Sequence, residues 1–270
     1  MWAVVTGASD GIGAAYCVEL ARLGFNVALV SRTVSKLEKV EAACKEANPQ
    51  IKTRIVQADF SNVTRTKEPE VLAFYAQLKT KLDDLDVAIL VNNAGVMYTG
   101  RVDETPADSQ KWKEIIDVDV MHIGMMNSTF QGKLIKRQAD SQGKLKSAII
   151  NVSSGIGYSH GAAGCAVYCA SKGYVNFYSV AQAFENKGAI DVQCLTPGFT
   201  RTNLLKDISQ KASGLVSISS ADCALGSLRD LGHPDFYLTG GDIRHDIGTV
   251  PASFLSRIPL IQYAFGFIFS

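Results

Sequence analysis

Apolar runs recur along the chain and alternate with segments of helical periodicity. Short runs that lack polar alternation are typical of strands covered on both faces. These runs are Trp2–Thr6, Val27–Ser31, Lys52–Gln57, Val87–Asn92, Ser147–Val152 and Asp191–Leu195. The segments with helical periodicity are Ala14–Leu23, Lys36–Ala47, Glu68–Leu82, Trp112–Gln131 and about 168–186. Strands and helices in this order predict an α/β fold, a doubly wound parallel sheet in three α/β/α layers.

A glycine-rich turn, Gly7-Ala-Ser9-Asp10-Gly11-Ile12-Gly13, joins the first strand to the first helix. Gly7 and Gly11 would let the backbone turn tightly and approach a pyrophosphate, and Gly13 would let helix and strand pack closely. The N-terminus of the helix would then hold the phosphates. Strand, turn, helix and strand within about thirty residues therefore predict a βαβ unit of the Rossmann fold that binds a dinucleotide.

The end of the second strand is where such folds contact the adenosine ribose. An acidic residue there would bond the 2′-hydroxyl group, whereas an arginine accommodates a 2′-phosphate. The residues are Ser31-Arg32-Thr33, followed by Lys36, without a carboxylate. This pattern favours NADP(H) as the cofactor, with Arg32 on the phosphate; the alternative is that Arg32 only caps a solvent-exposed loop.

Polar residues also follow the third and fourth strands. Asp59 lies at the carboxyl end of the third strand, where it could bond the adenine amino group or cap the next helix. Asn93, Ala94 and Gly95 follow the fourth strand and could hold the backbone against the cofactor. Turn chemistry alone would explain Gly95, but not the adjacent pair of asparagines.

The candidate chemistry lies after the fifth strand. Tyr168 and Lys172 are four residues apart, which places them on one face of a helix. The ammonium group would stabilise a phenolate and lower the tyrosine pKa from about 10, so that the phenol can exchange a proton with a carbonyl or alcohol oxygen. Ser154 could hold that same oxygen. Taken alone, the tyrosine and lysine could also be an ordinary amphipathic helix face.

The sixth strand leads into Pro197-Gly-Phe-Thr-Arg-Thr202 and then into the least regular part of the chain. We expect a lid over the substrate at about 199–220. An apolar segment at about 250–270 could wall a substrate pocket, form a subunit interface, touch a membrane surface or simply pack in the core.

Composition narrows the classes of function. The chain has 270 residues, within the range of one large domain, and shows no linker, repeat or low-complexity segment, so we expect a single domain over 1–270. Lysine plus arginine number 27 against 26 acidic residues, which gives no reason to expect nucleic acid as a partner. The cysteines and histidines lack metal-ligand spacing, so we expect buried, reduced thiols and no metal.

Four separated motifs together resemble the short-chain dehydrogenase/reductase family over nearly the whole chain. They are Thr6-Gly-x-x-x-Gly-Ile-Gly13, Asn92-Asn-Ala-Gly95, Ser154 with Tyr168-x-x-x-Lys172, and Pro197-Gly-x-x-x-Thr202. The resemblance implies that Tyr168 donates or accepts the proton and that Lys172 lowers its pKa and bonds the nicotinamide ribose. It also implies that Ser154 orients the substrate oxygen and that Thr202 holds the nicotinamide carboxamide.

The candidate residues for cofactor binding come from these motifs and from the strand ends. They are Gly7, Ser9, Asp10, Gly11, Ile12, Gly13, Arg32, Asp59, Asn93, Ala94, Gly95, Tyr168, Lys172, Pro197, Gly198, Thr200 and Thr202.

A narrower resemblance is to the branch of very-long-chain 3-oxoacyl-CoA reductases and 17-beta-hydroxysteroid dehydrogenases. It is carried by Trp2–Gly13, by Ser31–Thr33 with Lys36 and Leu37, and by Asn151–Gly155. It implies NADPH-dependent reduction of a bulky lipid-like ketone. The alternatives are a hydroxysteroid or retinoid dehydrogenase that runs in the oxidative direction, or a catalytically weak NADP(H)-binding regulatory protein.

The resemblance also bears on location and assembly. Members of the branch carry a hydrophobic segment ahead of the first strand, and here the first strand begins at Trp2. We expect association with the endoplasmic reticulum membrane if such a segment is missing from this chain, and a cytoplasmic protein otherwise. Contact with a membrane surface and a homodimer or homotetramer are further expectations.

One residue and one spacing depart from the family pattern. Asp119 stands in the helix position where an asparagine holds a water of the proton relay. Because a carboxylate accepts hydrogen bonds but donates none unless protonated, we expect Asp119 to alter the relay and its pH profile. The interval from Ser154 to Tyr168 is also one residue longer than usual, which leaves Ser153 as an alternative partner.

Overall fold

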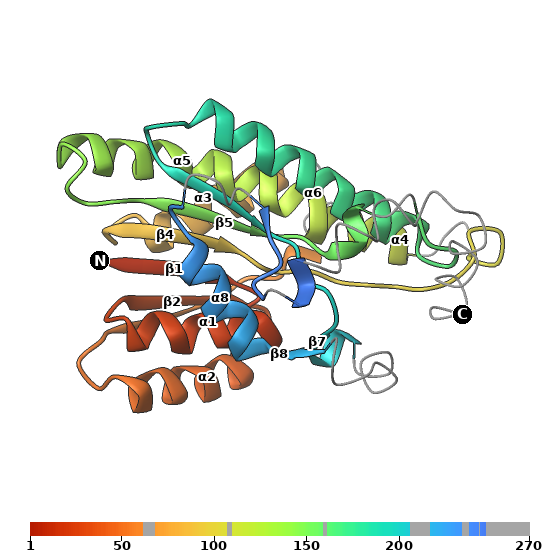
Figure 1. Cartoon of the computed structure of the whole chain (residues 1–270), viewed down its shortest axis with the longest axis horizontal. Helices are drawn as coiled ribbons and strands as arrows, with labels where there is room; N and C mark the ends of the chain where they lie inside the picture. Colours follow the sequence, from red (N-terminus) through yellow and green to blue (C-terminus); the bar gives the residue numbers. More distant parts are fainter. Residues whose placement is uncertain are drawn as a thin grey trace.

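Within the described part of the chain, seven parallel strands form the central sheet, in the order β3-β2-β1-β4-β5-β6-β9. Figure 1 shows β2, β1, β4 and β5 of this order. The structure is a computed structural model, and it describes residues 1–61, 68–106, 110–158, 161–205, 217–233, 238–242 and 244–246. The strands of the sheet are β1 (Trp2–Thr6), β2 (Asn26–Ser31), β3 (Thr53–Gln57), β4 (Val87–Asn92), β5 (Ala148–Val152), β6 (Asp191–Leu195) and β9 (Leu238–Thr239). The predicted doubly wound parallel sheet is confirmed, and each of the six predicted strands matches to within one residue at either end.

The seventh strand, β9, was not predicted. It has two residues and pairs with the end of β6 through Cys194 and Leu238. A run this short leaves no periodic signal in the sequence. Thr200–Arg201 (β7) and Ile218–Ser219 (β8) likewise form a separate small parallel pair beyond the carboxyl end of β6.

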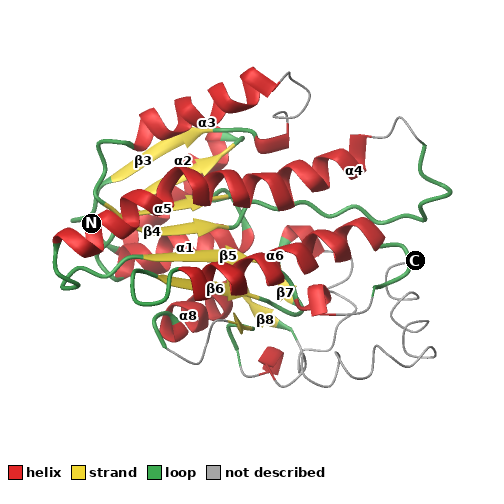
Figure 2. Ribbon diagram, turned by 90° about the horizontal axis from the view of Figure 1, so that it is seen from above, coloured by secondary structure: helices red, strands yellow, loops and turns green. Residues whose placement is uncertain are grey.

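Helices cover both faces of the sheet, which explains why its central strands β1 and β4 are mainly apolar. The helices are α1 (Gly11–Arg22), α2 (Val34–Ala47), α3 (Glu68–Leu82), α4 (Gln110–Ile115), α5 (His122–Asp140), α6 (Ala166–Glu185) and α8 (Ser220–Asp230). Ala3 and Val5 pack in a cluster with side chains of α1, α2 and α8, whereas Val4 between them packs with α3, α5 and α6. The alternation of side chains along β1 thus supplies both cores. Figure 2 shows helices in front of the sheet and behind it.

The helix predicted as one piece over Trp112–Gln131 is interrupted. Ile116–Met121 forms a π-helical segment between α4 and α5, and the backbone N–H of His122 donates to the carbonyl of Asp117, five residues back. Asp117, Val118 and Asp119 are all buried. In a regular α-helix three consecutive residues point in directions spread over about 200°, so the wider π turn allows all three to face protein.

Several predictions concern parts of the chain that the structure describes incompletely. Of the lid predicted at 199–220, residues 206–216 lie outside the described residues, as does the whole apolar segment at 250–270. All six cysteines are buried and unpaired, which confirms the prediction of buried thiols. Within the described ranges, every helix is too short or too polar to cross a membrane.

Candidate active site

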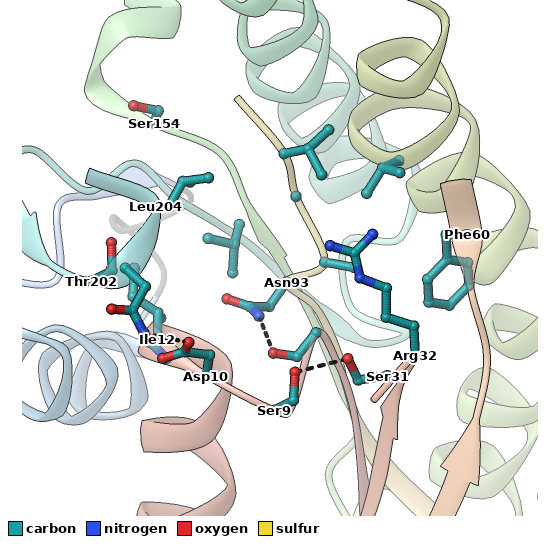
Figure 3. A pocket seen from close by; sticks show the side chains of 18 of the residues that line it. Ser9, Asp10, Ile12, Ser31, Arg32, Phe60, Asn93, Ser154, Thr202 and Leu204 are labelled. Carbon is teal, nitrogen blue, oxygen red and sulfur yellow. Dashed lines mark hydrogen bonds between the residues drawn. The ribbon is translucent and has the colours of Figure 1, made fainter. Parts of the chain in front are cut away.

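A pocket with a volume of about 330 Å³ lies at the carboxyl ends of the strands, where open parallel sheets bind their ligands. This volume is in the range of small-molecule sites. All of the candidate residues except Gly13 and Asp119 line the pocket. Figure 3 shows Asp10, Thr202, Asn93 and Arg32, from four separate parts of the chain, around this space.

The glycine-rich turn forms one wall of the pocket. Gly7 and Gly11 have φ angles of 61° and 55°, in the left-handed region that favours glycine. Asp10 caps α1, because its Oδ1 accepts a hydrogen bond of 2.7 Å from the backbone N–H of Gly11. The Nδ2 of Asn93 donates to the backbone oxygens of Thr6 (3.0 Å) and Gly7 (3.2 Å). The loop after β4 is therefore tied to the turn after β1.

Gly13 lies behind the pocket, where α1 crosses the sheet. A Cβ atom at this position would overlap the backbone oxygen of Gly7 and the Nδ2 of Asn93. We expect Gly13→Ala to lower the free energy of unfolding by about 1–3 kcal/mol, because neither neighbour can move without breaking the turn. Urea denaturation measures this change. Gly132→Ala is the matched control, since Gly132 lies in α5 with open space around it, and it should gain up to about 1 kcal/mol. Equal effects of the two substitutions would contradict the argument.

Two cations lie at the end of the pocket next to β2, and each faces a carboxylate. Arg32 Nη1 is 3.8 Å from Glu114 Oε1, and Lys36 Nζ is 3.6 Å from Asp10 Oδ2. Asp59 lies nearby, and its Oδ1 accepts hydrogen bonds from the backbone N–H (3.0 Å) and hydroxyl (2.7 Å) of Ser61. Asp59 thus organises the turn after β3, and it also lines the pocket.

Tyr168 and Lys172 lie on the buried face of α6, with relative exposures of 6% and 4%. The Ser154 hydroxyl lies close to the Tyr168 phenol and lowers its pKa. Ser153 is buried and donates its hydroxyl to the backbone oxygen of Lys172 (2.9 Å). Ser153 therefore fixes α6 against β5, and Ser154 is the serine that meets the phenol.

Asp119 lies next to Lys172, outside the lining of the pocket. It is fully buried, and its Oδ2 is 3.3 Å from Lys172 Nζ. Its Oδ1 accepts a hydrogen bond of 2.9 Å from the backbone N–H of Val96. Lys172 Nζ also lies 3.5 Å from the backbone oxygen of Val152. A buried ion pair with these extra hydrogen bonds holds the lysine in one place.

The charges of the three groups determine one another. Burial raises the pKa of Asp119, although Lys172 and the Val96 N–H oppose the rise. Burial lowers the pKa of Lys172, but Asp119 and Tyr168 reverse this effect and the net shift is upward. The pKa of Tyr168 is raised, mainly by burial and partly by Asp119, against the opposing effects of Lys172 and Ser154. The lowered tyrosine pKa predicted from Tyr-x-x-x-Lys is therefore wrong for this structure, because burial outweighs the ammonium group.

The loop after β6 forms another wall of the pocket. Pro197, Gly198, Thr200 and Thr202 all line it. The backbone N–H of Gly198 donates to Nδ1 of the buried His245 (3.0 Å). This contact could not be predicted from the sequence, because His245 lies 47 residues away from Gly198.

Comparison with known proteins identifies the family to which the chain belongs. The model of the family described as short chain dehydrogenase matches residues 1–213. The chain belongs to the short-chain dehydrogenase family. It is 33% identical over 212 residues to a very-long-chain 3-oxoacyl-CoA reductase-like protein of Arabidopsis thaliana. This match covers 77% of this chain and 62% of the relative. It is 32% identical over 209 residues to the human very-long-chain 3-oxoacyl-CoA reductase, with 76% and 61% covered. The matched part thus spans less than two thirds of either relative.

A relative from Caenorhabditis elegans with a steroid dehydrogenase name is 29% identical over 248 residues, and the match covers 90% of this chain and 86% of that protein. The predicted resemblance to both groups of this short-chain dehydrogenase branch is therefore confirmed. Among solved structures, a 7beta-hydroxysteroid dehydrogenase superposes with a TM-score of 0.75 at 23% identity, over 98% of this chain and 95% of the other. At this identity the superposition supports the fold.

Asp119 should set the pH dependence of this short-chain dehydrogenase. Its carboxylate raises the pKa of Tyr168, so Asp119→Asn should lower that pKa. Ketone reduction needs the protonated phenol, and its kcat/KM should then begin to fall at a correspondingly lower pH. Ser171→Ala is the control, because it removes a neutral contact to Asp119 Oδ2 (3.3 Å) without changing charge. A basic limb that stays in place in Asp119→Asn would contradict this role.

Further residues line the pocket in this short-chain dehydrogenase that the sequence did not single out. Val96, Val118 and Leu204 are apolar, and Phe60 follows Asp59 at the end of β3. Asn203 donates its Nδ2 to Asp10 Oδ2 (2.6 Å), which joins the loop after β6 to the cap of α1. Phe60 and Val96 directly follow strand-end motifs and could have been inferred from position, whereas Val118 depends on the π turn.

Proposed function

We propose that the protein is an NADP(H)-dependent reductase that acts on a ketone of a bulky, lipid-like substrate. The observation that carries this proposal is the buried phenol of Tyr168, which meets the Ser154 hydroxyl on one side and the Lys172–Asp119 pair on the other. One pocket extends from this phenol to Arg32. It can therefore hold a dinucleotide along its length and a carbonyl group at its end.

The residues of the pocket fit this cofactor. The turn from Gly7 to Gly11 presents backbone without side chains, and it leads to the N-terminus of α1, which favours phosphate. Arg32 and Lys36 offer positive charge at the adenosine end, suited to a 2′-phosphate. Asn93 and Thr202 line the pocket from the loops that follow β4 and β6. When bound, a reduced nicotinamide supplies the hydride for the carbonyl carbon.

The protein's own groups would handle the substrate oxygen. Ser154 donates a hydrogen bond to the carbonyl oxygen and orients it toward Tyr168. Tyr168 then transfers its phenolic proton to that oxygen as negative charge develops there. The ammonium group of Lys172, which Asp119 and the Val152 carbonyl hold in place, stabilises the resulting phenolate. The hydrogen bonds from the Val96 N–H to Asp119 and from the Ser153 hydroxyl to the Lys172 carbonyl keep this geometry while the proton moves.

The charge balance favours the reductive direction. A raised pKa keeps the Tyr168 phenol protonated at neutral pH, and the protonated form is the one that reduction needs. Oxidation of an alcohol needs the phenolate, which becomes abundant only as the pH rises toward that raised pKa. We therefore propose reduction as the reaction near neutral pH.

The substrate class is inferred from the relatives. Proteins named as 3-oxoacyl-CoA reductases are about a third identical to the chain, and Val96, Val118 and Leu204 give the pocket apolar lining. A 3-oxoacyl-CoA is accordingly the first candidate, together with an endoplasmic reticulum location. A hydroxysteroid is the second candidate, because the relative with a steroid dehydrogenase name matches over the larger share of its own length.

A ketone screen tests the proposal. The full chain is mixed with NADPH or NADH and with 3-oxoacyl-CoA esters of increasing length, ketosteroids and retinal, and loss of the reduced nicotinamide absorbance is followed. We expect turnover with NADPH that increases with the apolar size of the ketone. Tight binding of NADPH without turnover on any member of the panel would instead support a regulatory NADP(H)-binding protein.

A further inference from the structure

Arg32, the residue proposed for the 2′-phosphate, already faces an acidic side chain from a distant part of the chain. Its Nη1 atom is 3.8 Å from Oε1 of Glu114, which lies in α4. In Figure 3 the Arg32 side chain extends from the end of β2 into the pocket. The pocket lining contains Arg32 but not Glu114, so the carboxylate lies just beyond the wall.

Glu114 is held more firmly than the arginine that it faces. The Tyr98 hydroxyl donates a hydrogen bond of 2.6 Å to Glu114 Oε2. The Glu114 side chain is 16% exposed, against 60% for Arg32. Partial burial and the Glu114 carboxylate raise the pKa of Tyr98 to about 12, so the phenol remains a donor throughout the physiological range. Glu114 is therefore a fixed charge, and Arg32 is the partner that can turn away.

The second cation of this region, Lys36, also has a carboxylate beside it. Lys36 Nζ lies 3.6 Å from Asp10 Oδ2, and Asp10 is itself fixed by capping α1 and by the Nδ2 of Asn203. Both cations that the described pocket offers at the adenosine end thus have a carboxylate beside them. An incoming phosphate meets less net positive charge than Arg32 and Lys36 alone would present.

We propose that Glu114 is a specificity-determining residue that weakens the preference for NADPH over NADH. To bind Arg32, a 2′-phosphate would have to displace Glu114 from the guanidinium group. The phosphate would then lie close to the Glu114 carboxylate. NADH has no such group and makes no such exchange. Glu114 therefore costs binding affinity only for the phosphorylated cofactor, which is discrimination by a repulsive element. The inference rests on the proposed function, in that it assumes a dinucleotide in this pocket.

The test compares dissociation constants for NADPH and NADH, measured by isothermal titration calorimetry on the full chain. Glu114→Gln keeps the shape of the side chain and an oxygen that accepts the Tyr98 hydrogen bond. We expect it to tighten NADPH binding by about threefold to tenfold and to leave NADH within about twofold. Glu114→Ala should act in the same direction, which covers the case in which one variant folds poorly. A ratio of the two constants that is unchanged, or NADPH binding that weakens, would overturn the proposal.

Two controls separate this inference from the proposed function. Glu104→Gln makes the same change in charge at an exposed residue paired with Arg101, and it should leave both constants unchanged. Arg32→Ala should weaken NADPH binding and spare NADH. If Arg32→Ala acts in this way but Glu114→Gln has no effect, the role of Glu114 fails and the proposed cofactor stands. If Arg32→Ala leaves NADPH binding unchanged, the proposed phosphate site itself fails.

Discussion

Tyr168→Phe is expected to lower kcat for ketone reduction by about 10²- to 10⁴-fold, because it removes the proton donor and keeps the ring. The ring is 6% exposed, so its packing is retained. The dissociation constant for NADPH should change little, since the phenol acts on the substrate oxygen. Single-turnover rates with saturating NADPH, together with calorimetric titration of the cofactor, measure the two effects separately.

The same helix offers a matched control for this substitution. Tyr174 is also in α6, but it is more exposed and stacks on Tyr178 with ring centroids 5.5 Å apart. Tyr174→Phe removes a hydroxyl from the same kind of side chain and should leave kcat within about twofold, an effect typical of surface substitutions. If Tyr168→Phe retained the rate of Tyr174→Phe, another group would have to donate the proton.

Lys172→Met is expected to lower the free energy of unfolding by about 3–5 kcal/mol near neutral pH, in addition to its effect on catalysis. The substitution leaves Asp119, which is fully buried, without its counter-ion. Burial would then hold the folded-state pKa of Asp119 well above the unfolded value of about 3.9. The loss should therefore be small at pH values below the unfolded pKa and grow as the pH rises toward the folded pKa. Urea denaturation at several pH values measures it.

A second substitution tests the cause of this loss. Lys172→Met combined with Asp119→Asn removes both charges, so most of the stability should return while activity stays low. Lys113→Met is a control, because Lys113 lies at the same 3.3 Å from the buried Asp117 but is 39% exposed. Water reaches that ammonium group, so a loss of about 1 kcal/mol or less is expected there. If the double variant were as unstable as Lys172→Met, the lost packing of the lysine stem would be the cause.

Most of the strands could be predicted from the sequence because they are buried on both faces and their sequences are mainly apolar, as in β1 and β4. Trp2–Thr6 and Asp191–Leu195 were predicted at their observed bounds. The break in the helix after Ile115 could not be predicted, because apolar and acidic residues in Ile116–Met121 fit an α-helix and a π turn equally well. Only contacts with Val96 and Lys172, distant in sequence, show which of the two places Asp119 correctly.

The residues of the candidate site also differ in whether they could be predicted from the sequence. Residues at the ends of strands, such as Arg32 and Asn93, could be named in advance because parallel strands bring their carboxyl ends to one edge. The direction of the Tyr168 pKa shift could not, because it depends on how completely the fold buries the phenol. Glu114 and Tyr98 gave no signal either, since their importance comes from a contact with Arg32 across the sheet edge.

The π turn at Ile116–Met121 has a consequence for evolution. The turn follows α4, whose Glu114 lies beside the adenosine end of the pocket. The turn itself contains Asp119, which lies beside the reacting end. A π turn holds one more residue than an α-helical turn, so deleting a single codon within it could restore a regular helix. Because the wider turn accommodates the extra residue, α4 and α5 would keep their present directions relative to each other. The deletion would instead change the residues inside the turn, so it could displace Asp119 from Lys172 while Glu114 stays beside Arg32, without any substitution in the pocket.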